Sequence, residues 1–409
     1  MSKRVLSICL LAAALFTRPA WAAQNVANTS QKGSLLIFPL IVTDPGFLDA
    51  TLVPILDTSD TFIEVSNDEN GPVHIECSYI NEAKGRVDFD FTLTAKATAS
   101  WDALTGSGVG APPFPTNIIY RPIPGFGPVN PNRGELVCFA VDQGGANQVA
   151  FNHLTGTATV VNALDPDAIQ PKQAFRYNAW SFVARNKAGL PEADNVIQGT
   201  PGLLALTGAG AGTYDACPAY NIATFNPNRS VSAESLAAPA LETIDNDLSV
   251  VSCNQDLRQD FVLHLTKLQF TVWNANENSF TGAFECIDSV QTVGLAAEDN
   301  TIMTARSNFD ESTLRTPNAR FMVQGVSSIQ CPTSFPQGGG LPPITVPATE
   351  NAGLLGVITS SVGIREVLPL LPTLEDDELG STTQTAGSMP GFVKWDPAGS
   401  TVPAVKAHS

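Results

Sequence analysis

The chain has 409 residues, of which 43% are hydrophobic and 15% charged, and its formal net charge at pH 7 is −17. A chain this acidic is a poor candidate for binding nucleic acid or an anionic membrane surface, because both kinds of target attract clustered Lys and Arg. Its length is sufficient for two domains of ordinary size, each with its own hydrophobic core.

Residues 1–22 have the composition of a secretory signal peptide. Lys3 and Arg4 form a positively charged start, residues 5–16 a short apolar stretch, and residues 20–22 (AWA) a small-x-small cleavage site. The apolar stretch is too short to span a bilayer, which takes about 20 residues. We therefore expect an exported protein, periplasmic, outer-surface or extracellular, with no transmembrane segment after cleavage.

Six of the seven cysteines lie outside residues 1–22, and they predict three disulfide bonds. An even number of cysteines in an exported chain is typical of disulfide pairing. Their spacing contains no CxxC motif and no nearby histidine of the kind that zinc sites use. Sequential pairing is preferred because it places one disulfide in each block of predicted strands, and exchange among the last four cysteines is the main alternative. The preferred set is Cys77–Cys138, Cys217–Cys253 and Cys286–Cys331.

Most segments between the loops have the apolar pattern of β-strands. Residues 34–42 (SLLIFPLIV) are continuously apolar, which indicates a strand covered on both faces, and Pro39 indicates an edge or a bend there. Residues 87–97 alternate between apolar and polar, which indicates a strand with one face exposed to water. Residues 261–273 also alternate, but the alternation shifts by one residue near residues 266–267, which predicts a bulge. Further strands are predicted at 60–67, 73–80, 135–141, 157–163, 174–184, 248–253, 280–290, 319–329 and 353–361.

Two segments resemble each other. Residues 62–77 (FIEVSNDENGPVHIEC) and 270–286 (FTVWNANENSFTGAFEC) both contain two β-rich runs around an Asn/Glu cluster and end in Glu-Cys. Similar alternation and similar turn residues favour similar local structure, so we predict equivalent hairpins at residues 60–80 and 268–289 and a structural duplication. One short helix is predicted at 234–244.

These elements predict an all-β fold, since short strands separated by Gly, Pro and Asn are typical of sandwiches. We expect two immunoglobulin-like or β-sandwich domains, residues 23–190 and 191–365, which are cross-linked internally by the disulfides. Long Pro- and Gly-rich loops are predicted at 106–133 and 331–348. Residues 366–409, which contain an acidic run, are predicted to form a flexible tail.

No catalytic motif is found, and we predict a protein that is not an enzyme. The sequence contains no HExxH, no GxSxG and no Walker loop, and its four histidines are dispersed. His153 is the one histidine that we expect a loop to present.

Two acidic clusters are candidates for a calcium site, since calcium binds carboxylate and amide oxygens from loops. They contain Asp68 and Glu69, and Asp245 and Asp247. The alternative is that Asp and Asn simply form turns. No other cofactor is predicted.

The tryptophans suggest core packing more than ligand binding. Trp101, Trp180 and Trp273 lie in or beside predicted strands. A sugar-binding platform would use exposed aromatic rings, but Phe, Trp and Tyr make up only 8% of the chain. We therefore expect all three tryptophans in the core.

Several blocks resemble a group of exported bacterial β-rich proteins to which no activity is assigned. The resemblance implies export and the order of the domains only, and it transfers no functional residue. The blocks, in chain order, are DTFIEVSND (60–68), SWDALTG (100–106), FNHLTGTATVVN (151–162), YNAWSF (177–182), YDACP (214–218), CNQDLRQD (253–260), WNANENSFTGAFEC (273–286) and VQGVSSIQCP (323–332).

The leading functional hypothesis is a non-enzymatic exported protein with a structural, adhesive or assembly role at the cell envelope or outside the cell. It would bind a protein partner or a second copy of itself through its long loops or an open sheet edge. The alternatives are a calcium- or carbohydrate-binding module, and a hydrolase of unrecognised type.

Overall fold

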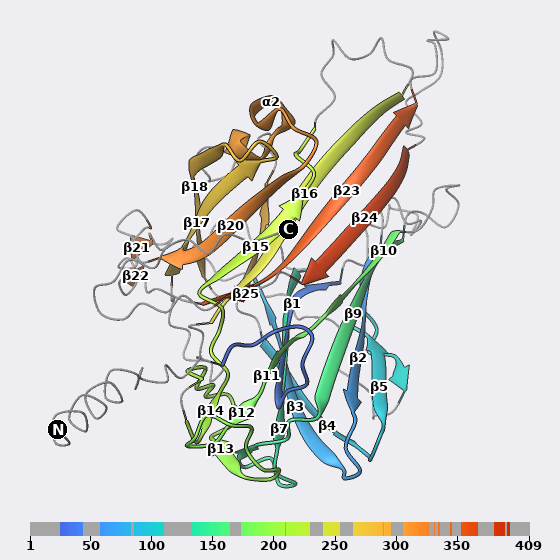
Figure 1. Ribbon diagram of the computed structural model, residues 1–409. Coiled ribbons are helices and arrows are strands. Elements are labelled where there is room, and N and C mark those ends of the chain that lie inside the picture. Colours follow the sequence, from blue (N-terminus) through green and yellow to red (C-terminus); the bar gives the residue numbers. More distant parts are fainter. Residues whose placement is uncertain are drawn as a thin grey trace, which may run out of the picture.

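The protein is nearly all β, as the strand patterns predict, and its sheets are antiparallel (Figure 1). Among the described residues, the two short helical segments are η2 (Arg306–Phe309) and α2 (Glu311–Leu314). The predicted signal peptide (1–22) and most of both long loops lie outside the described residues. The computed structural model describes residues 25–43, 58–82, 86–109, 133–163, 173–208, 210–229, 240–253, 265–288, 290–295, 306–326, 331, 334–335, 344–345, 353–366, 380–388 and 391–392.

The first half of the described chain forms two large sheets, in the lower part of Figure 1. Sheet 1 has the strand order β11-β1-β7-β3-β4, and β8 and β13 extend it from β7. Its strands are β1 (Leu35–Val42), β3 (Val73–Asn81), β4 (Arg86–Leu93), β7 (Arg133–Val141), β8 (Gln148–Val149), β11 (Trp180–Phe182) and β13 (Ile197–Gly199). Sheet 2 has the order β10-β9-β2-β5-β6. Its strands are β2 (Thr58–Asn67), β5 (Thr98–Asp102), β6 (Gly108–Val109), β9 (Leu154–Ala163) and β10 (Gln173–Asn178).

The second half forms two more large sheets, in the upper part of Figure 1. Sheet 3 has the order β18-β17-β20-β15-β25 and sheet 4 the order β19-β16-β23-β24. The strands of sheet 3 are β15 (Tyr220–Phe225), β17 (Leu265–Asn274), β18 (Ser279–Asp288), β20 (Ala319–Val326) and β25 (Gly391–Phe392). Those of sheet 4 are β16 (Ala240–Ser252), β19 (Val290–Gly294), β23 (Leu354–Glu366) and β24 (Gly380–Ser388). Two small pairs complete the fold: β12 (Ala184–Arg185) with β14 (Thr213–Tyr214), and β21 (Ser334–Phe335) with β22 (Ile344–Thr345).

Strand β1 is buried on both faces, as its continuous apolar run predicts. Leu36 and Phe38 point into a core between sheets 1 and 2, whereas Leu35 and Ile37 point into a second core. Successive side chains of a strand alternate between its faces, so a strand between two cores needs apolar residues at every position. The β1–β7 register shifts between Phe38 and Ile41, so the proline between them lies at a bend, one of the two predicted possibilities.

The second core joins the two halves of the chain. It contains Phe139 and Trp180 of sheet 1, Phe270 of sheet 3 and Leu248 of sheet 4. The indole Nε1 of Trp180 donates a hydrogen bond to the backbone oxygen of Gly356 in β23 (3.3 Å), and β1 contacts both β16 and β23. The sheets thus stack in a sandwich-like way, and a division into two domains near residue 190 stays a prediction.

The three predicted disulfide pairs are at bonding distance. The Cα atoms are 4.1 Å apart in Cys77–Cys138, 6.4 Å in Cys217–Cys253 and 5.8 Å in Cys286–Cys331. All lie within the separation of about 7 Å that a disulfide can bridge. Cys77 and Cys138 face each other directly across β3 and β7.

The predicted pair of equivalent hairpins is wrong. β17 and β18 do pair as a hairpin, but β2 lies in sheet 2 and β3 in sheet 1, so residues 62–77 form an arch between two sheets. What the two segments share is the turn. Each begins at a buried asparagine, Asn67 or Asn274, whose side-chain oxygen accepts the N–H of the residue two positions later. Turn chemistry was visible in the sequence, whereas the choice of strand partner depends on the rest of the fold.

Three smaller expectations differ from the structure. Residues 240–244 of the predicted helix lie in β16, because pairing with β23 along its whole length outweighs local helix propensity. The register shift of β17 lies between Gln269 and Thr271, a few residues after the predicted bulge. Residues 380–388 pair with β23 as β24, so part of the predicted tail belongs to a sheet.

Candidate functional site

The turn after β2 carries the first predicted calcium candidates, Asp68 and Glu69. Asn67 fixes this turn from beneath: its Oδ1 accepts the Glu69 N–H (2.8 Å), and its Nδ2 donates to the Gly71 oxygen (2.8 Å) and the Thr94 oxygen (3.1 Å). Asn67 is buried, so these bonds are shielded from water. The two acidic side chains are therefore presented by a well-ordered backbone.

His153, in the turn before β9, lies against these two carboxylates and a third, as the prediction of a loop-presented histidine allows. Its Nδ1 lies 3.5 Å from Glu69 Oε2 and 3.7 Å from Asp68 Oδ1, and its Nε2 lies 3.4 Å from Asp194 Oδ2. The Phe151 ring packs edge-on against the imidazole, with 5.2 Å between ring centroids. We call Asp68, Glu69, His153 and Asp194 the His153 cluster.

Lysines already compensate the negative charge of Asp68. The Lys32 ammonium pairs with its carboxylate, and the Lys96 ammonium donates to its backbone oxygen. The hydrogen bond from Lys32 lowers the pKa of Asp68. Burial opposes this shift, and the charges of Lys32, Lys96 and His153 lower the pKa further. Within the described part of the chain, no three His, Cys, Asp or Glu side chains are placed to hold a metal ion.

The second calcium candidate does not lie in a loop, so the predicted loop placement is wrong. Asp245 and Asp247 lie inside β16, where they pair with Ser361 and Thr359 of β23. Asn246, between them, points the other way and is buried. Strand pairing on both sides of β16 outweighs the turn preference of Asp and Asn here, and the two acidic clusters belong to different sheets.

A feature that the sequence reasoning missed lies beside the His153 cluster. Six large apolar side chains of the described residues are exposed, and four of them lie between Leu190 and Leu203. We call residues 190–203 the apolar segment. Its apolar residues follow neither a strand nor a helix period and are interspersed with Pro, Gly and Asn, so periodicity did not single them out. The four are Leu190 (61% exposed), Val196 (40%), Ile197 (61%) and Leu203 (44%).

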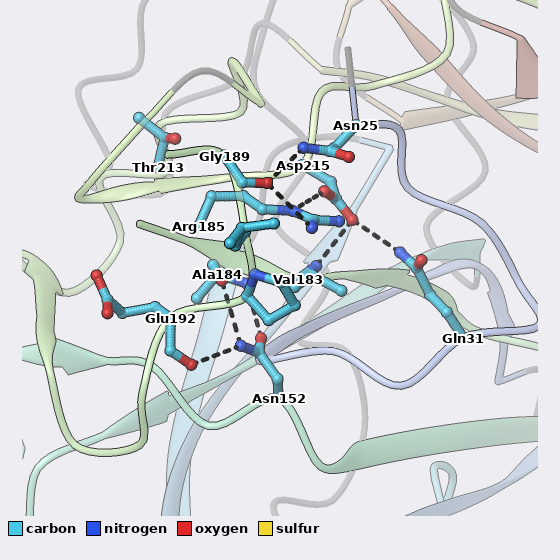
Figure 2. A network of polar contacts seen from close by, with 12 residues as sticks. Asn25, Gln31, Asn152, Val183, Ala184, Arg185, Gly189, Glu192, Thr213 and Asp215 are labelled. Atoms are coloured by element: carbon cyan, nitrogen blue, oxygen red, sulfur yellow. Dashed lines mark hydrogen bonds and ion pairs between the residues drawn. The ribbon is translucent and has the colours of Figure 1, made fainter. Parts of the chain in front are cut away.

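A buried polar network holds the stretch of chain that leads into the apolar segment (Figure 2). Its centre is the fully buried carboxylate of Asp215. Oδ1 of Asp215 accepts the Arg185 Nε–H (2.6 Å), and Oδ2 accepts bonds from Gln31 Nε2 (2.8 Å) and the Val183 N–H (3.0 Å). The carboxylate thus has both a cationic partner and neutral donors, as a buried charge requires.

The same network reaches the backbone just before and within the apolar segment, as Figure 2 shows. The Gly189 oxygen accepts a bond from Asn25 Nδ2 (2.7 Å) and a longer one from the Arg185 guanidinium (3.4 Å). Asn152 Nδ2 donates to the Glu192 oxygen (3.3 Å), while Asn152 Oδ1 accepts the Ala184 N–H (2.7 Å). The loop that carries Leu190 is therefore fastened at its base.

Backbone bonds hold the rest of the segment against the His153 turn. The Asn195 N–H donates to the Ala150 oxygen, and the Ala150 N–H donates to the Val196 oxygen, each at 2.8 Å. Ile197 then pairs with Val149 in the β13–β8 ladder. The His153 cluster and the apolar segment thus form one surface on a common support.

The other candidate residues are dispersed. Trp101 and Trp180 are buried, as predicted, but Trp273 is only half-buried, so its assignment to the core is wrong. It occupies an outward-facing position of β17, whose buried face is formed by the alternate residues. His74 pairs with Asp90 on the outer face of sheet 1 (3.3 Å). His264 and His408 lie outside the described residues.

The helices of the described residues are too short to cross a membrane. No protein-family model matches this chain, and no curated protein matches it.

Proposed function

We propose that this protein is an exported, non-enzymatic β-sandwich protein with a structural, adhesive or assembly role at the cell envelope or outside the cell. It acts by binding a protein, either a partner or a second copy of itself. The observation that carries the proposal is the concentration of exposed apolar side chains on the apolar segment. Apolar side chains held in water by a rigid backbone are typical of protein interfaces.

The surroundings of these side chains favour a partner with basic residues at the rim of its contact. Glu192 and Asp194 lie within the apolar segment, and Asp68 and Glu69 lie beside it around His153. Carboxylates beside an apolar surface steer a cationic partner towards it and repel an acidic one. The net charge of −17 adds to this selection at long range.

The environment of His153 supports a role in ion pairing. A catalytic histidine activates a neighbouring hydroxyl or thiol. Here the polar neighbours of the ring are three carboxylates, and no Ser, Thr or Cys of the described residues donates to or accepts from it. A calcium-binding role is less well supported, because Lys32 already pairs with Asp68.

Site-specific photo-crosslinking in cells that make the protein tests the proposal. A photoreactive amino acid replaces Ile197, which is 61% exposed, and in a control it replaces Ser312, which is exposed on α2. We expect a discrete crosslinked species from position 197 and none from position 312. A mass of twice this chain identifies a second copy of itself, and any other mass a different partner.

A second substitution shows whether the apolar surface itself makes the contact. Leu190→Asp should reduce the yield of the crosslink from position 197 several-fold, because a carboxylate cannot be buried unpaired in an interface. Position 197 giving no discrete species, the same species appearing from position 312, or an unchanged yield in Leu190→Asp would each contradict the proposal.

A further inference from the structure

The outer face of sheet 3, in the upper part of Figure 1, carries a row of side chains from three neighbouring strands. Trp273 of β17 is opposite Arg320 of β20, and Arg320 is opposite Thr224 of β15. The residues next to them along each strand are buried, so these three point outward. Trp273 and Arg320 are half-buried and Thr224 is exposed.

Arg320 is held in place by two neighbours. Its guanidinium carbon lies 5.5 Å from the centroid of the Trp273 ring, and its Nη2 pairs with the Glu277 carboxylate. Glu277 is in the turn between β17 and β18, with its N–H bonded to the Asn274 oxygen (3.0 Å). A planar guanidinium fixed by stacking and by an ion pair loses little freedom when it binds a further group.

A groove of about 490 Å³ lies beside this row. This volume is within the range of about 300–1,000 Å³ that is typical of small-molecule sites. Its floor includes buried Phe225 and Ala319. The polar side chains that line it are Thr224, Asn226, Asn274, Glu277, Asn318, Arg320 and Ser360.

Two of these groups have unused hydrogen-bonding capacity. Asn226 and Asn318 are exposed, and their side-chain amides make no hydrogen bond with any residue that the structure describes. Their backbones are nevertheless fixed. The Asn226 oxygen accepts a bond from Asn246 Nδ2 (2.8 Å), and the Asn318 oxygen accepts one from the Thr316 hydroxyl (2.9 Å).

This combination of groups matches the hydroxyls of a sugar. A hydroxyl both donates and accepts, and an asparagine amide offers one oxygen acceptor and two N–H donors side by side. Glu277 adds acceptors and Arg320 adds donors, while their mutual pairing leaves no net charge to attract a phosphate or carboxylate. The acidic chain also repels anions at long range.

We propose that the groove lined by Asn226, Glu277, Asn318 and Arg320 binds a neutral carbohydrate. The amides of Asn226 and Asn318 contact adjacent hydroxyls, the Glu277–Arg320 pair contacts a further hydroxyl, and Trp273 positions Arg320 without touching the ligand. The proposal is independent of the protein-binding surface, which lies on residues of sheets 1 and 2 and the adjoining loops.

The experiment applies the purified full-length protein to an array of neutral and anionic oligosaccharides, and then titrates it calorimetrically with the best-bound one. We expect binding to neutral glycans. The double variant Asn226→Ala with Asn318→Ala should weaken this binding at least about tenfold, since two sets of hydrogen bonds are lost. The matched control is Asn276→Ala, an exposed asparagine of the adjacent turn that does not line the groove; it should bind like the parent.

Unchanged melting temperatures of both variants show that the fold is intact, because none of the three removed side-chain amides is hydrogen-bonded to a residue that the structure describes. The proposal is overturned by any of three results. These are no neutral glycan bound at millimolar concentration, a preference for the anionic glycans, or a double variant whose affinity equals that of Asn276→Ala.

Discussion

At the scale of single residues, Asp60 in β2 is a carboxyl group held partly out of water. Burial raises its pKa to about 6, helped by the nearby carboxylate of Asp102 and opposed by bonds from backbone N–H groups. Its Oδ1 accepts the N–H of Thr61 (2.7 Å) and of Leu104 (3.0 Å). The group thus ties β2 to the turn after β5, while its burial and the nearby Asp102 favour the protonated form.

The raised pKa of Asp60 predicts a loss of stability with rising pH. An unfolded Asp ionises near pH 3.9, and here the folded state ionises near pH 6, so between these values the unfolded state binds fewer protons. The free energy of unfolding should therefore fall between about pH 4 and pH 6 and stay low above. Asp60→Asn, which keeps an oxygen acceptor, should leave stability unchanged at pH 4 and raise it at pH 7.5 by about 1 kcal/mol, after a discount for partial exposure.

Urea denaturation of both proteins at the two pH values measures this difference. A variant that is less stable at pH 7.5 than the parent would show that Asp60 is needed in its charged form.

At the scale of elements, the network around Asp215 connects four separate stretches of chain. Asn25 and Gln31, Asn152, the region of β11 and β12, and Asp215 after β14 all contribute to it. Its role is to hold the loop at residues 186–192 in one conformation. Because the Asp215–Arg185 pair is buried, removal of one charge leaves the other without compensation.

Asp215→Asn should destabilise the protein by about 3–5 kcal/mol, the range for a broken buried ion pair. It should also speed hydrogen exchange of backbone amides in residues 186–195 more than elsewhere. Denaturation and exchange measured by mass spectrometry check the two effects. The control is Asp90→Asn, which breaks an exposed pair with His74 and should cost less than about 0.5 kcal/mol. Equal exchange at 186–195 in both variants would refute a local role for the network.

The elements differ in how far they could be predicted from the sequence. The strands were predictable where the apolar pattern is clear, as in the continuous apolar run of β1 and the alternation of β4. Strand partners were not, because Asn67 and Asn274 begin similar turns yet only β17 and β18 pair with each other. Strand pairing depends on which arrangement buries the apolar face of each strand in a core, and that is decided by residues far away in the chain.

The candidate surface was predictable only in part. Asp68, Glu69 and His153 were recognisable as polar residues in turns, but nothing local indicates that they meet or that Asp194 joins them. Leu190 and Ile197 look like core residues by composition, and only the three-dimensional arrangement leaves them in water.

At the scale of the whole molecule, the second core makes the two halves of the chain interdependent. Trp180 and Phe139 pack in the same cluster as Leu248 and Phe270. Contacts across the halves include the ion pair of Arg133 with Asp247 (3.8 Å) and the hydrogen bond from the Thr292 N–H to Glu82 (2.7 Å).

This sharing predicts one cooperative unfolding transition. If neither half keeps its core without the other, scanning calorimetry of the disulfide-intact protein should show a single peak whose van't Hoff and calorimetric enthalpies agree. Trp180→Ala should move that peak to lower temperature as a whole, without splitting it. Two separate peaks in the parent protein would instead mean that each half is stable alone.

The two-sided burial of β1 also governs the order in which the chain can assemble. β1 lies near the beginning of the described chain, but one neighbour, β7, begins at Arg133 and the other, β11, at Trp180. The strands that contact it from the second core, β16 and β23, are later still. Such high contact order slows folding and leaves an apolar strand unprotected while the rest of the chain is made. During synthesis β1 therefore emerges well before the strands that enclose it.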